Sequence, residues 1–234
     1  MSCDTLFFER KLPRVARPHG HPGINYISKQ KGKENMKIET KRLILRSFRN
    51  DDWKDLVEGL NDLQVTKTLA NVPHPYTKKD AMWWINRQKK LWAAKKRRKV
   101  YEFAIELKSE KKLIGGSGFN KINKFTKTAI SGSWIARKYW RNGYIKEAKI
   151  ALIDFAFNKL KLQKLETEAF VENKVSNSMS KKLGYKLEGT RKRSHRSKAT
   201  GKWHDINEYG LFKIDWKRVR PRLVKEVKRN INGL

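Results

Sequence analysis

The sequence contains little of what a secreted or membrane-spanning protein needs. Cys3 is the single cysteine among 234 residues, which excludes an intrachain disulfide and fits a reducing compartment. The longest apolar runs are short, for example residues 150–153, and none could cross a bilayer. The N-terminus has no hydrophobic signal segment. We therefore expect a cytoplasmic protein with no membrane partner.

Acidic residues are also scarce. The chain has 23 Asp and Glu against 56 Lys and Arg, which gives a formal net charge of +33. Residues 1–35 contribute +4 and residues 217–234 contribute +6, so +23 belongs to the segment between them, with basic clusters at 95–99 and 191–202. We interpret this charge as attraction to RNA, the ribosome or another polyanion. The alternative is an organism whose proteins are all lysine-rich. In either case the field should repel polycationic substrates.

Enough hydrophobic residues remain for one folded domain. They make up 38% of the chain and include eight Trp and ten Phe. Residues 1–35 show no periodicity and precede Met36, so we expect a disordered extension or an upstream artefact, with a functional basic arm as the alternative. The domain is predicted to span residues 36–216, followed by a basic C-terminal tail, 217–234, that is helical or frayed.

Strand and helix patterns alternate along this domain and predict a mixed α/β sheet. The predicted strands cover residues 38–46, 100–107, 113–119, 129–136, 165–171, 185–193 and 203–213. The predicted helices cover residues 51–60, 78–97, 145–160 and 176–183. Asn50 or Asp51 should cap the first helix, and Thr77 with Asp80 resembles a capping box for the second. Hairpin turns are expected at 109–111 and 199–202.

A glycine turn, residues 140–144 (Trp-Arg-Asn-Gly-Tyr), precedes the most regular predicted helix. Backbone N–H groups at such a turn and at the helix N-terminus form a cradle for phosphate, and Lys138 and Arg141 add positive charge. Ordinary turns also use glycine, so the turn alone leaves both interpretations open. Four charged residues of the helix are expected on its outer side: Lys146, Lys149, Asp154 and Lys159.

A spaced polar pattern further along the chain favours the cofactor interpretation. Asn173-x-x-Ser176 is followed by Lys-Leu-Gly-Tyr at 182–185 and by Glu188-Gly189. With Trp134-Ile135 and the glycine turn, this order resembles the Rim-type branch of the GNAT family, acyl-CoA-dependent N-acetyltransferases that modify ribosomal-protein N-termini. Residues 40–46 and 201–209 also match, so the resemblance spans about residues 37–216.

The resemblance implies a fold, a co-substrate and a set of contacts. The fold is a twisted, mixed, mostly antiparallel sheet flanked by helices, in which a splayed parallel strand pair holds acetyl-CoA. No metal is implied. The residues that fall on acetyl-CoA-binding positions are Trp134, Ile135, Ala136, Arg137, Lys138, Trp140, Arg141, Asn142, Gly143, Tyr144, Ile145, Asn173 and Ser176. Ser176, or as an alternative Tyr185, would be the acid that protonates the departing CoA thiolate.

The sequence departs from the family pattern at three places. Arg141 replaces the usual first glycine of the turn, and Ile145 replaces a small residue, which should limit how closely phosphates approach. Residues 128–132 lack the glutamate that many relatives carry before the turn. Some relatives place a carboxylate seven residues after the Glu of the Glu-Gly pair, and that position here is His195. Imidazole is a suitable base at neutral pH.

Alternatives to His195 remain open. It could be an exposed loop histidine in a basic hairpin, and His204 and Asp205 are the other candidates, with Asp205 expected to brace the hairpin. Water could also relay the proton. Our hypothesis from the sequence takes His195 as the base and Ser176 as the acid.

The sequence therefore predicts an acetyl-CoA-dependent N-acetyltransferase acting on a primary amine. The expected acceptor is a protein or peptide N-terminal α-amine, with ribosome or RNA association through the basic surface, in a monomer or homodimer. One alternative is a degenerate scaffold that binds RNA without catalysis. Another is an enzyme that acetylates an antibiotic amine.

Overall fold

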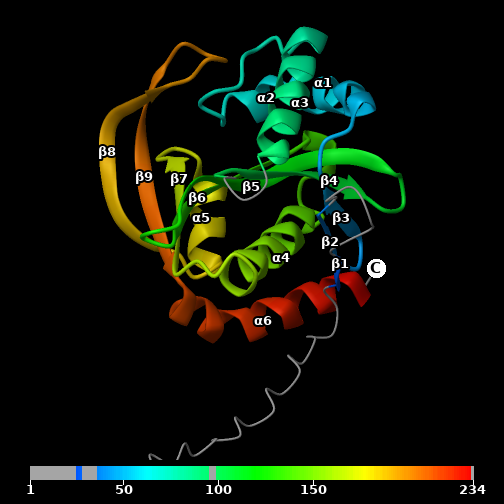
Figure 1. The fold of residues 1–234 in the computed structure, drawn as a ribbon. Coiled ribbons are helices and arrows are strands. Elements are labelled where there is room, and N and C mark those ends of the chain that lie inside the picture. Colours follow the sequence, from blue (N-terminus) through cyan, green and yellow to red (C-terminus); the bar gives the residue numbers. More distant parts are fainter. Residues whose placement is uncertain (1–24, 28–35, 95–98, 233–234) are drawn as a thin grey trace, which may run out of the picture.

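The computed structural model describes residues 25–27, 36–94 and 99–232. Within them, nine strands form one sheet in the order β1-β2-β3-β4-β5-β6-β7-β9-β8. The strands are β1 (Asn25–Ile27), β2 (Lys37–Glu39), β3 (Leu43–Arg46), β4 (Tyr101–Leu107), β5 (Lys112–Asn123), β6 (Thr128–Ile135), β7 (Lys164–Phe170), β8 (Lys186–Arg196) and β9 (Trp203–Phe212). The helices are α1 (Trp53–Leu60), α2 (Leu63–Thr66), α3 (Lys78–Ala93), α4 (Tyr144–Asn158), α5 (Lys174–Lys182) and α6 (Lys213–Asn232). The predicted mixed, mostly antiparallel sheet is confirmed (Figure 1).

The parallel pair β6–β7 interrupts this antiparallel sheet. The two strands, joined through α4, pair from Thr128 opposite Lys164 to Ser131 opposite Thr167. Beyond those positions β6 continues to Ile135 and β7 to Phe170 without pairing to each other. The strands therefore separate after Ser131, as expected for a splayed pair.

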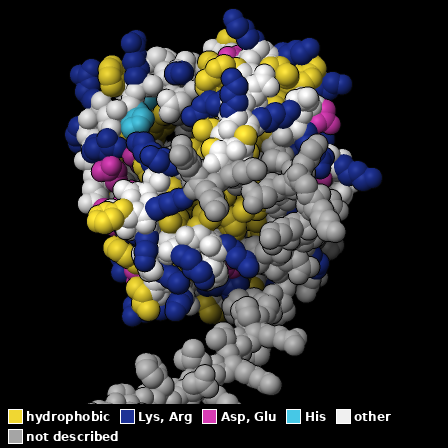
Figure 2. All heavy atoms as spheres, in the orientation of Figure 1, with side chains coloured by type: hydrophobic (Ala, Val, Ile, Leu, Met, Phe, Trp, Pro, Cys, Tyr) yellow, Lys and Arg dark blue, Asp and Glu magenta, His cyan; other side chains and the backbone are white. Residues whose placement is uncertain are grey.

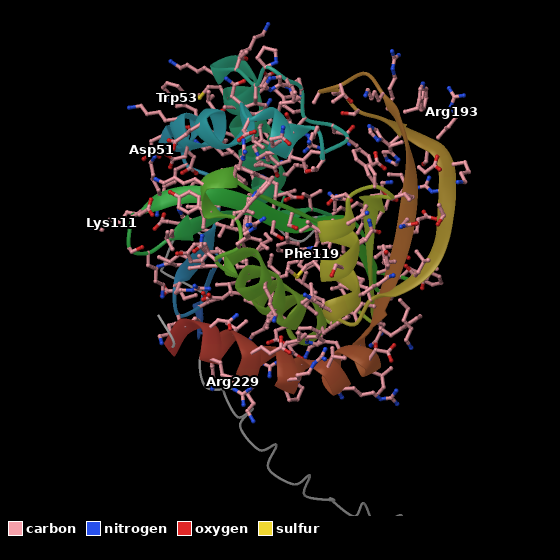
Figure 3. The ribbon with its side chains drawn as sticks, turned by 180° about the vertical axis from the view of Figure 1, so that it is seen from behind. Asp51, Trp53, Lys111, Phe119, Arg193 and Arg229 are labelled. Atoms are coloured by element: carbon pink, nitrogen blue, oxygen red, sulfur yellow. The ribbon has the colours of Figure 1, made fainter. Side chains whose placement is uncertain are left out.

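Helices cover both faces of the sheet, and the hydrophobic core is larger on one face than on the other. α4, α5 and α6 lie on one face, and α1, α2 and α3 lie on the other (Figure 1). The larger core cluster packs sheet residues against α4 and α6, and it includes Phe103, Phe119 and Phe155. Figure 3 shows Phe119 in the interior near α4. A smaller cluster packs α1 and α3 against the opposite face.

The N-terminal segment differs from its prediction in two ways. The single strand expected at 38–46 is two antiparallel strands, β2 and β3, because the chain turns where the Thr40 N–H donates to the Leu43 carbonyl at 3.0 Å. Residues 25–27, expected to be disordered, pair with β2 as β1. The rest of the extension lies outside the described residues.

The helix starts agree only in part with the sequence. Neither Asn50 nor Asp51 caps α1; a short 3-10 helix, Asn50–Asp52, precedes it, and the Asp52 carboxylate accepts from the Arg49 N–H at 2.7 Å. The capping box of Thr77 and Asp80 at the start of α3 is confirmed. Residues 95–97 of that predicted helix lie outside the described residues, as does most of the basic cluster 95–99.

Asp154 was wrongly predicted to lie on the outer side of α4. It is 1% exposed and accepts hydrogen bonds from Trp216 Nε1 at 2.8 Å and from Arg220 Nε at 2.7 Å. Both partners belong to α6, whose Leu223 is also buried. Residues 217–232, expected as a tail, therefore belong to a helix packed against α4. None of the described helices meets the length and hydropathy that a membrane crossing requires.

The β8–β9 hairpin bends toward the face of the sheet that carries α1, α2 and α3 (Figure 1). At its tip, the Lys198 N–H donates to the Ala70 carbonyl at 3.0 Å, in the loop between α2 and α3. The hairpin and that loop thus enclose one side of the sheet near the separated ends of β6 and β7.

Candidate functional site

The turn before α4 adopts the conformation that glycine favours at two positions. Gly143 has φ 74°, and Arg141 has φ 65°, in the left-handed region that non-glycine residues rarely occupy. A side chain there is disfavoured by about 1 kcal/mol. The geometry thus explains why a glycine usually stands at position 141 in the family pattern. Arg141 keeps the backbone shape at some energetic expense.

The β2–β3 turn holds the first turn of α4 in place. The Glu147 carboxylate accepts from Thr40 Oγ1 at 2.6 Å and from Arg42 Nε at 2.8 Å. Arg42 also donates through Nη1 to the Asn142 carbonyl at 3.1 Å, and its guanidinium lies over the Tyr144 ring. Glu147 is 4% exposed, so this buried cluster fixes the backbone between Asn142 and Tyr144.

The N-terminus of α4 is able to bind an anion. Gly143 is its N-cap, and no side chain of the described residues caps it. The first N–H groups of a helix lack intrahelical partners, and the helix dipole favours negative charge there. Lys138 and Arg141 flank the turn. Ile145 packs against the hydrophobic core, so its branched side chain turns away from this N-terminus.

Beyond the turn, β6 borders the gap left by its separation from β7. Among the described residues, a Cβ built on Gly132 meets no atom within 4 Å, so the face of the strand at Gly132 is open, and residues 132–135 do not pair with β7. The strand is held from its other side, where Ser117 Oγ donates to the Gly132 carbonyl at 2.9 Å. The Trp134 side chain packs in the cluster under α1, and Trp140 Nε1 donates to the Ile135 carbonyl at 2.9 Å. An extended ligand arm can thus lie along 132–135 and reach the turn.

The Asn173 and Ser176 pair forms the start of α5. The Asn173 side chain is the N-cap and accepts from the Ser176 N–H at 3.1 Å. This cap places Ser176, which is partly buried, in the first turn of the helix. The helix follows directly after β7, so Ser176 lies near the end of the strand that borders the gap.

Asn177 is a positioning residue that the sequence analysis missed. Its Nδ2 donates to the carbonyls of Phe170 and Asn173, at 2.9 and 2.8 Å. Its Oδ1 accepts from Tyr209 Oη at 2.7 Å and from Asn207 Nδ2 at 2.8 Å. Asn177 therefore fixes α5 to both β7 and β9. An asparagine directly after the Asn-x-x-Ser pattern was the available signal.

Tyr185 lies where β6 and β7 separate. Its phenolic oxygen is 3.2 Å from Ser131 Oγ, and its side chain is buried. Burial raises the pKa of Tyr185 to about 12, so the phenol is neutral at physiological pH. The structure brings it to the base of the gap.

His195 lies on the edge strand β8, opposite His204 on β9. Its Nδ1 is 3.2 Å from Ser194 Oγ, and its Nε2 is 3.8 Å from Glu168 Oε2. Both ring nitrogens thus face neighbouring protein groups. Among the described residues, no hydrogen bond or ion pair joins His195 to Ser176 or Tyr185.

The two other base candidates are engaged within the hairpin region. His204 stacks on Phe170 with ring centroids 4.1 Å apart, and its Nδ1 contacts the Glu172 carboxylate. Asp205 accepts from the Arg193 N–H at 2.8 Å and from Lys192 Nζ at 2.9 Å, and these bonds lower its pKa. Asp205 braces the hairpin, as the sequence suggested.

Basic side chains are frequent on the described surface. Figure 2 shows Lys and Arg side chains scattered among hydrophobic and other side chains on the described part of the visible face, with few Asp and Glu among them. Arg193 projects from the outer edge of the β8–β9 hairpin (Figure 3). In the part of the chain that the structure describes, no group of three or more His, Cys, Asp or Glu could hold a metal ion.

Known proteins share this sequence pattern and fold. Residues 42–186 match the family described as the acetyltransferase (GNAT) domain. The uncharacterized N-acetyltransferase YnaD of Bacillus subtilis is 29% identical over 77% of this chain and 99% of its own length. The ribosomal-protein-serine acetyltransferase of Escherichia coli is 33% identical over 36% of this chain and 48% of its own. The Vibrio cholerae spermidine N-acetyltransferase, solved with CoA and spermine, has the same fold at a TM-score of 0.64, with 18% identity over 76% of this chain and 99% of its own.

Proposed function

Because this chain belongs to the GNAT family of N-acetyltransferases, we propose that it transfers the acetyl group of acetyl-CoA to the N-terminal α-amine of a protein. One observation supports the cofactor site most strongly. The N-terminus of α4, with left-handed backbone at Arg141 and Gly143, follows β6, whose residues 132–135 do not pair with β7. A pyrophosphate at the turn and a pantetheine arm along residues 132–135 fit this arrangement.

Different residues around the gap bind different parts of acetyl-CoA. The N–H groups at the start of α4 bind the pyrophosphate, supported by Lys138 and Arg141. Backbone groups of β6 pair with the pantetheine amides. Asn173 keeps Ser176 in position, and its amide nitrogen, which donates to no described residue, is available to the cofactor.

Acetyl transfer then needs a neutral amine, an acid for the leaving thiolate and a base for the amine proton. Acetyl-CoA supplies the activated thioester. The Ser176 hydroxyl donates the proton to the departing sulfur, with buried Tyr185 as the alternative donor. His195 is the base that the sequence suggests, although the structure turns both of its ring nitrogens toward Ser194 and Glu168.

The acceptor class rests on charge and on one relative. The Escherichia coli relative acts, by its name, on a ribosomal-protein serine. A formal charge of +33 disfavours polyamine substrates such as those of the Vibrio cholerae enzyme. The same charge supports a second candidate function, RNA or ribosome association, with or without catalysis. An antibiotic amine is the third acceptor class to test.

A CoA-release assay tests activity and acceptor together. The full chain is mixed with acetyl-CoA and, in parallel, with peptides carrying free N-termini, aminoglycosides and polyamines. We expect release with the peptides and little with polyamines. A melting temperature that millimolar acetyl-CoA does not raise, with no release in any mixture, would refute the enzymatic proposal. Steep salt-dependent RNA binding under those circumstances would favour the second candidate.

A further inference from the structure

Glu102 lies on the face of the sheet that α1 and α3 cover. It belongs to β4, where its neighbours Tyr101 and Phe103 turn to the opposite face and pack on Phe155 of α4. Side chains alternate along a strand, so Glu102 shares its face with Ala104, which packs in the cluster under α1 and α3. This is the face that the β8–β9 hairpin and the loop after α2 enclose.

A row of glycines leads from Glu102 to the gap. Glu102 pairs with Gly118 on β5, and Gly118 pairs with Gly132 on β6. A Cβ on Gly118 would lie 2.2 Å from the Tyr101 carbonyl oxygen, 2.7 Å from Glu102 Cα and 2.6 Å from Glu102 Oε2, so the β4 backbone and the carboxylate together occupy the space that a side chain at position 118 would need. Gly132 has open space on the same side.

The register therefore brings this carboxylate close to the site of transfer. Neighbouring strands lie about 4.8 Å apart, so Gly132 is one strand spacing from Gly118, and Glu102 Oε2 lies more than 4 Å from a Cβ built on Gly132. Gly132 is the first β6 residue beyond the last pair with β7, Ser131 opposite Thr167. Nothing larger than a hydrogen atom at positions 118 and 132 separates the carboxylate from the opening of the gap.

Other carboxylates near this face are held by cations. Glu106, two residues from Ala104 on the same strand, is paired with Arg46 at 2.5 Å and Arg49 at 3.1 Å. Glu168 of β7 is paired with Arg191 at 2.9 Å. Glu102 has Arg87 as its charged neighbour, and burial outweighs that cation and raises the pKa of Glu102 to about 7. A base is most effective when its pKa lies near the working pH.

We propose that Glu102 is the general base of the transfer, a role that rests on the proposed acetyltransferase function. The Glu102 carboxylate takes one proton from the acceptor ammonium and leaves a neutral amine. The amine nitrogen forms a bond to the thioester carbonyl carbon as the carbon–sulfur bond breaks. The sulfur takes a proton from Ser176, the second amine proton passes through solvent to the Ser176 alkoxide, and protonated Glu102 releases its proton to solvent. The products are an N-acetyl amide and free CoA thiol.

The first test replaces Glu102 by glutamine, which has the same shape and cannot accept the proton. We expect Glu102→Gln to lower kcat/KM for the amine about 100-fold at pH 8. It should also remove the limb of the pH profile on which wild-type activity rises through about pH 7. The matched control is Glu166→Gln, on the part of β7 that pairs with β6, where the partly exposed carboxylate is 3.3 Å from Lys164; this variant should keep both the rate and the limb.

A second variant tests whether the space at Gly132 connects the Glu102 carboxylate to the acceptor amine. Gly132→Ala adds a methyl group where no atom lies within 4 Å, so the fold should be unchanged. The methyl group would stand between Glu102 and the amine, and we expect kcat to fall at least tenfold with an unchanged melting temperature.

Acetyl-CoA-induced thermal shifts, measured on every variant, separate the two levels of the proposal. Wild type that neither binds nor transfers would overturn the acetyltransferase function itself. An active wild type whose Glu102→Gln variant stays within threefold and keeps the pH limb would overturn the role of Glu102 alone. Loss of the limb in His195→Ala but not in Glu102→Gln would assign the base to His195.

Discussion

Tyr185 Oη lies 3.2 Å from Ser131 Oγ, at the last residue of β6 that pairs with β7. Ser131 Oγ also donates to the Glu166 carbonyl, and Thr167 Oγ1 donates to the Ser131 carbonyl. These bonds end the parallel ladder at a defined position. The phenol thus has a structural partner at the fork, whereas Ser176 presents its hydroxyl from the first turn of α5.

This difference predicts unequal effects of removing the two hydroxyl groups. Ser176→Ala should lower kcat at least tenfold while the affinity for acetyl-CoA stays within threefold. Tyr185→Phe should lower kcat less than threefold and lower the free energy of unfolding by about 1 kcal/mol, since one buried hydrogen bond is lost. Steady-state kinetics and urea unfolding of both variants provide the measurements. The reverse order of kinetic effects would make Tyr185 the acid.

In the turn before α4, the backbone strain at Arg141 and the positive charge of its side chain can be tested separately. Arg141→Gly should raise the free energy of unfolding by about 1 kcal/mol because glycine adopts φ near 65° freely. It should also weaken acetyl-CoA binding several-fold at low salt, with a smaller difference at high salt.

Two variants at the same position separate these effects. Arg141→Lys keeps both charge and strain and should resemble wild type. Arg141→Asn tolerates the left-handed backbone but loses the charge, so it should gain stability and lose affinity. Calorimetric titration and thermal unfolding measure both. An Arg141→Gly variant no more stable than wild type would contradict the strain.

The contact between Asp154 and α6 predicts that the C-terminal helix supports the whole fold. Asp154→Asn removes a buried negative charge that accepts hydrogen bonds from both Trp216 and Arg220, and we expect the free energy of unfolding to fall by about 3 kcal/mol. The control is Glu226→Gln, which disrupts the partly buried pair of Glu226 with Lys146 and should change stability by less than about 1 kcal/mol. Equal, small effects in both variants would show that α6 contributes little.

Local patterns in the sequence were sufficient for most elements of the fold. The capping box at Thr77, the strand–helix–strand unit and the hairpins at 109–111 and 199–202 are each encoded by neighbouring residues. Asp154 was misplaced because helical periodicity treats any charged residue as outward-facing. Its burial depends on Trp216 and Arg220, which are distant in the sequence.

In the candidate site, too, local motifs could be predicted from the sequence, whereas contacts between distant segments could not. The turn and the Asn-x-x-Ser segment are local motifs, and the sequence identified them. The sequence did not indicate Glu102, because the family pattern directs attention to residues 128–132 and to the hairpin residues His195, His204 and Asp205. Its proximity to Gly132 follows from the register of β4 on β5 and of β5 on β6, which no single segment encodes.

Lys149 on α4 provides a last prediction, on stability and pH. Burial lowers the pKa of Lys149 to about 8, from an ordinary value near 10.5. Below pH 8 the charged side chain is disfavoured in the folded protein relative to the unfolded chain. Above about pH 10.5 the lysine is neutral in both states, and the cost of burying its charge is absent. The free energy of unfolding of the wild type therefore rises as the pH rises from 8 to 10.5.

Lys149→Met should therefore raise the free energy of unfolding by about 1 kcal/mol at pH 7. The advantage over wild type should shrink between pH 8 and pH 10.5, where the folded and then the unfolded lysine lose their protons. Lys181→Met, on the exposed side of α5, is the control and should show no such pH dependence. Denaturant unfolding at pH 7, 9 and 10.5 provides the measurement. A gain that stays constant across this range would mean that methionine stabilises α4 by packing alone, and that the buried charge has no part in it.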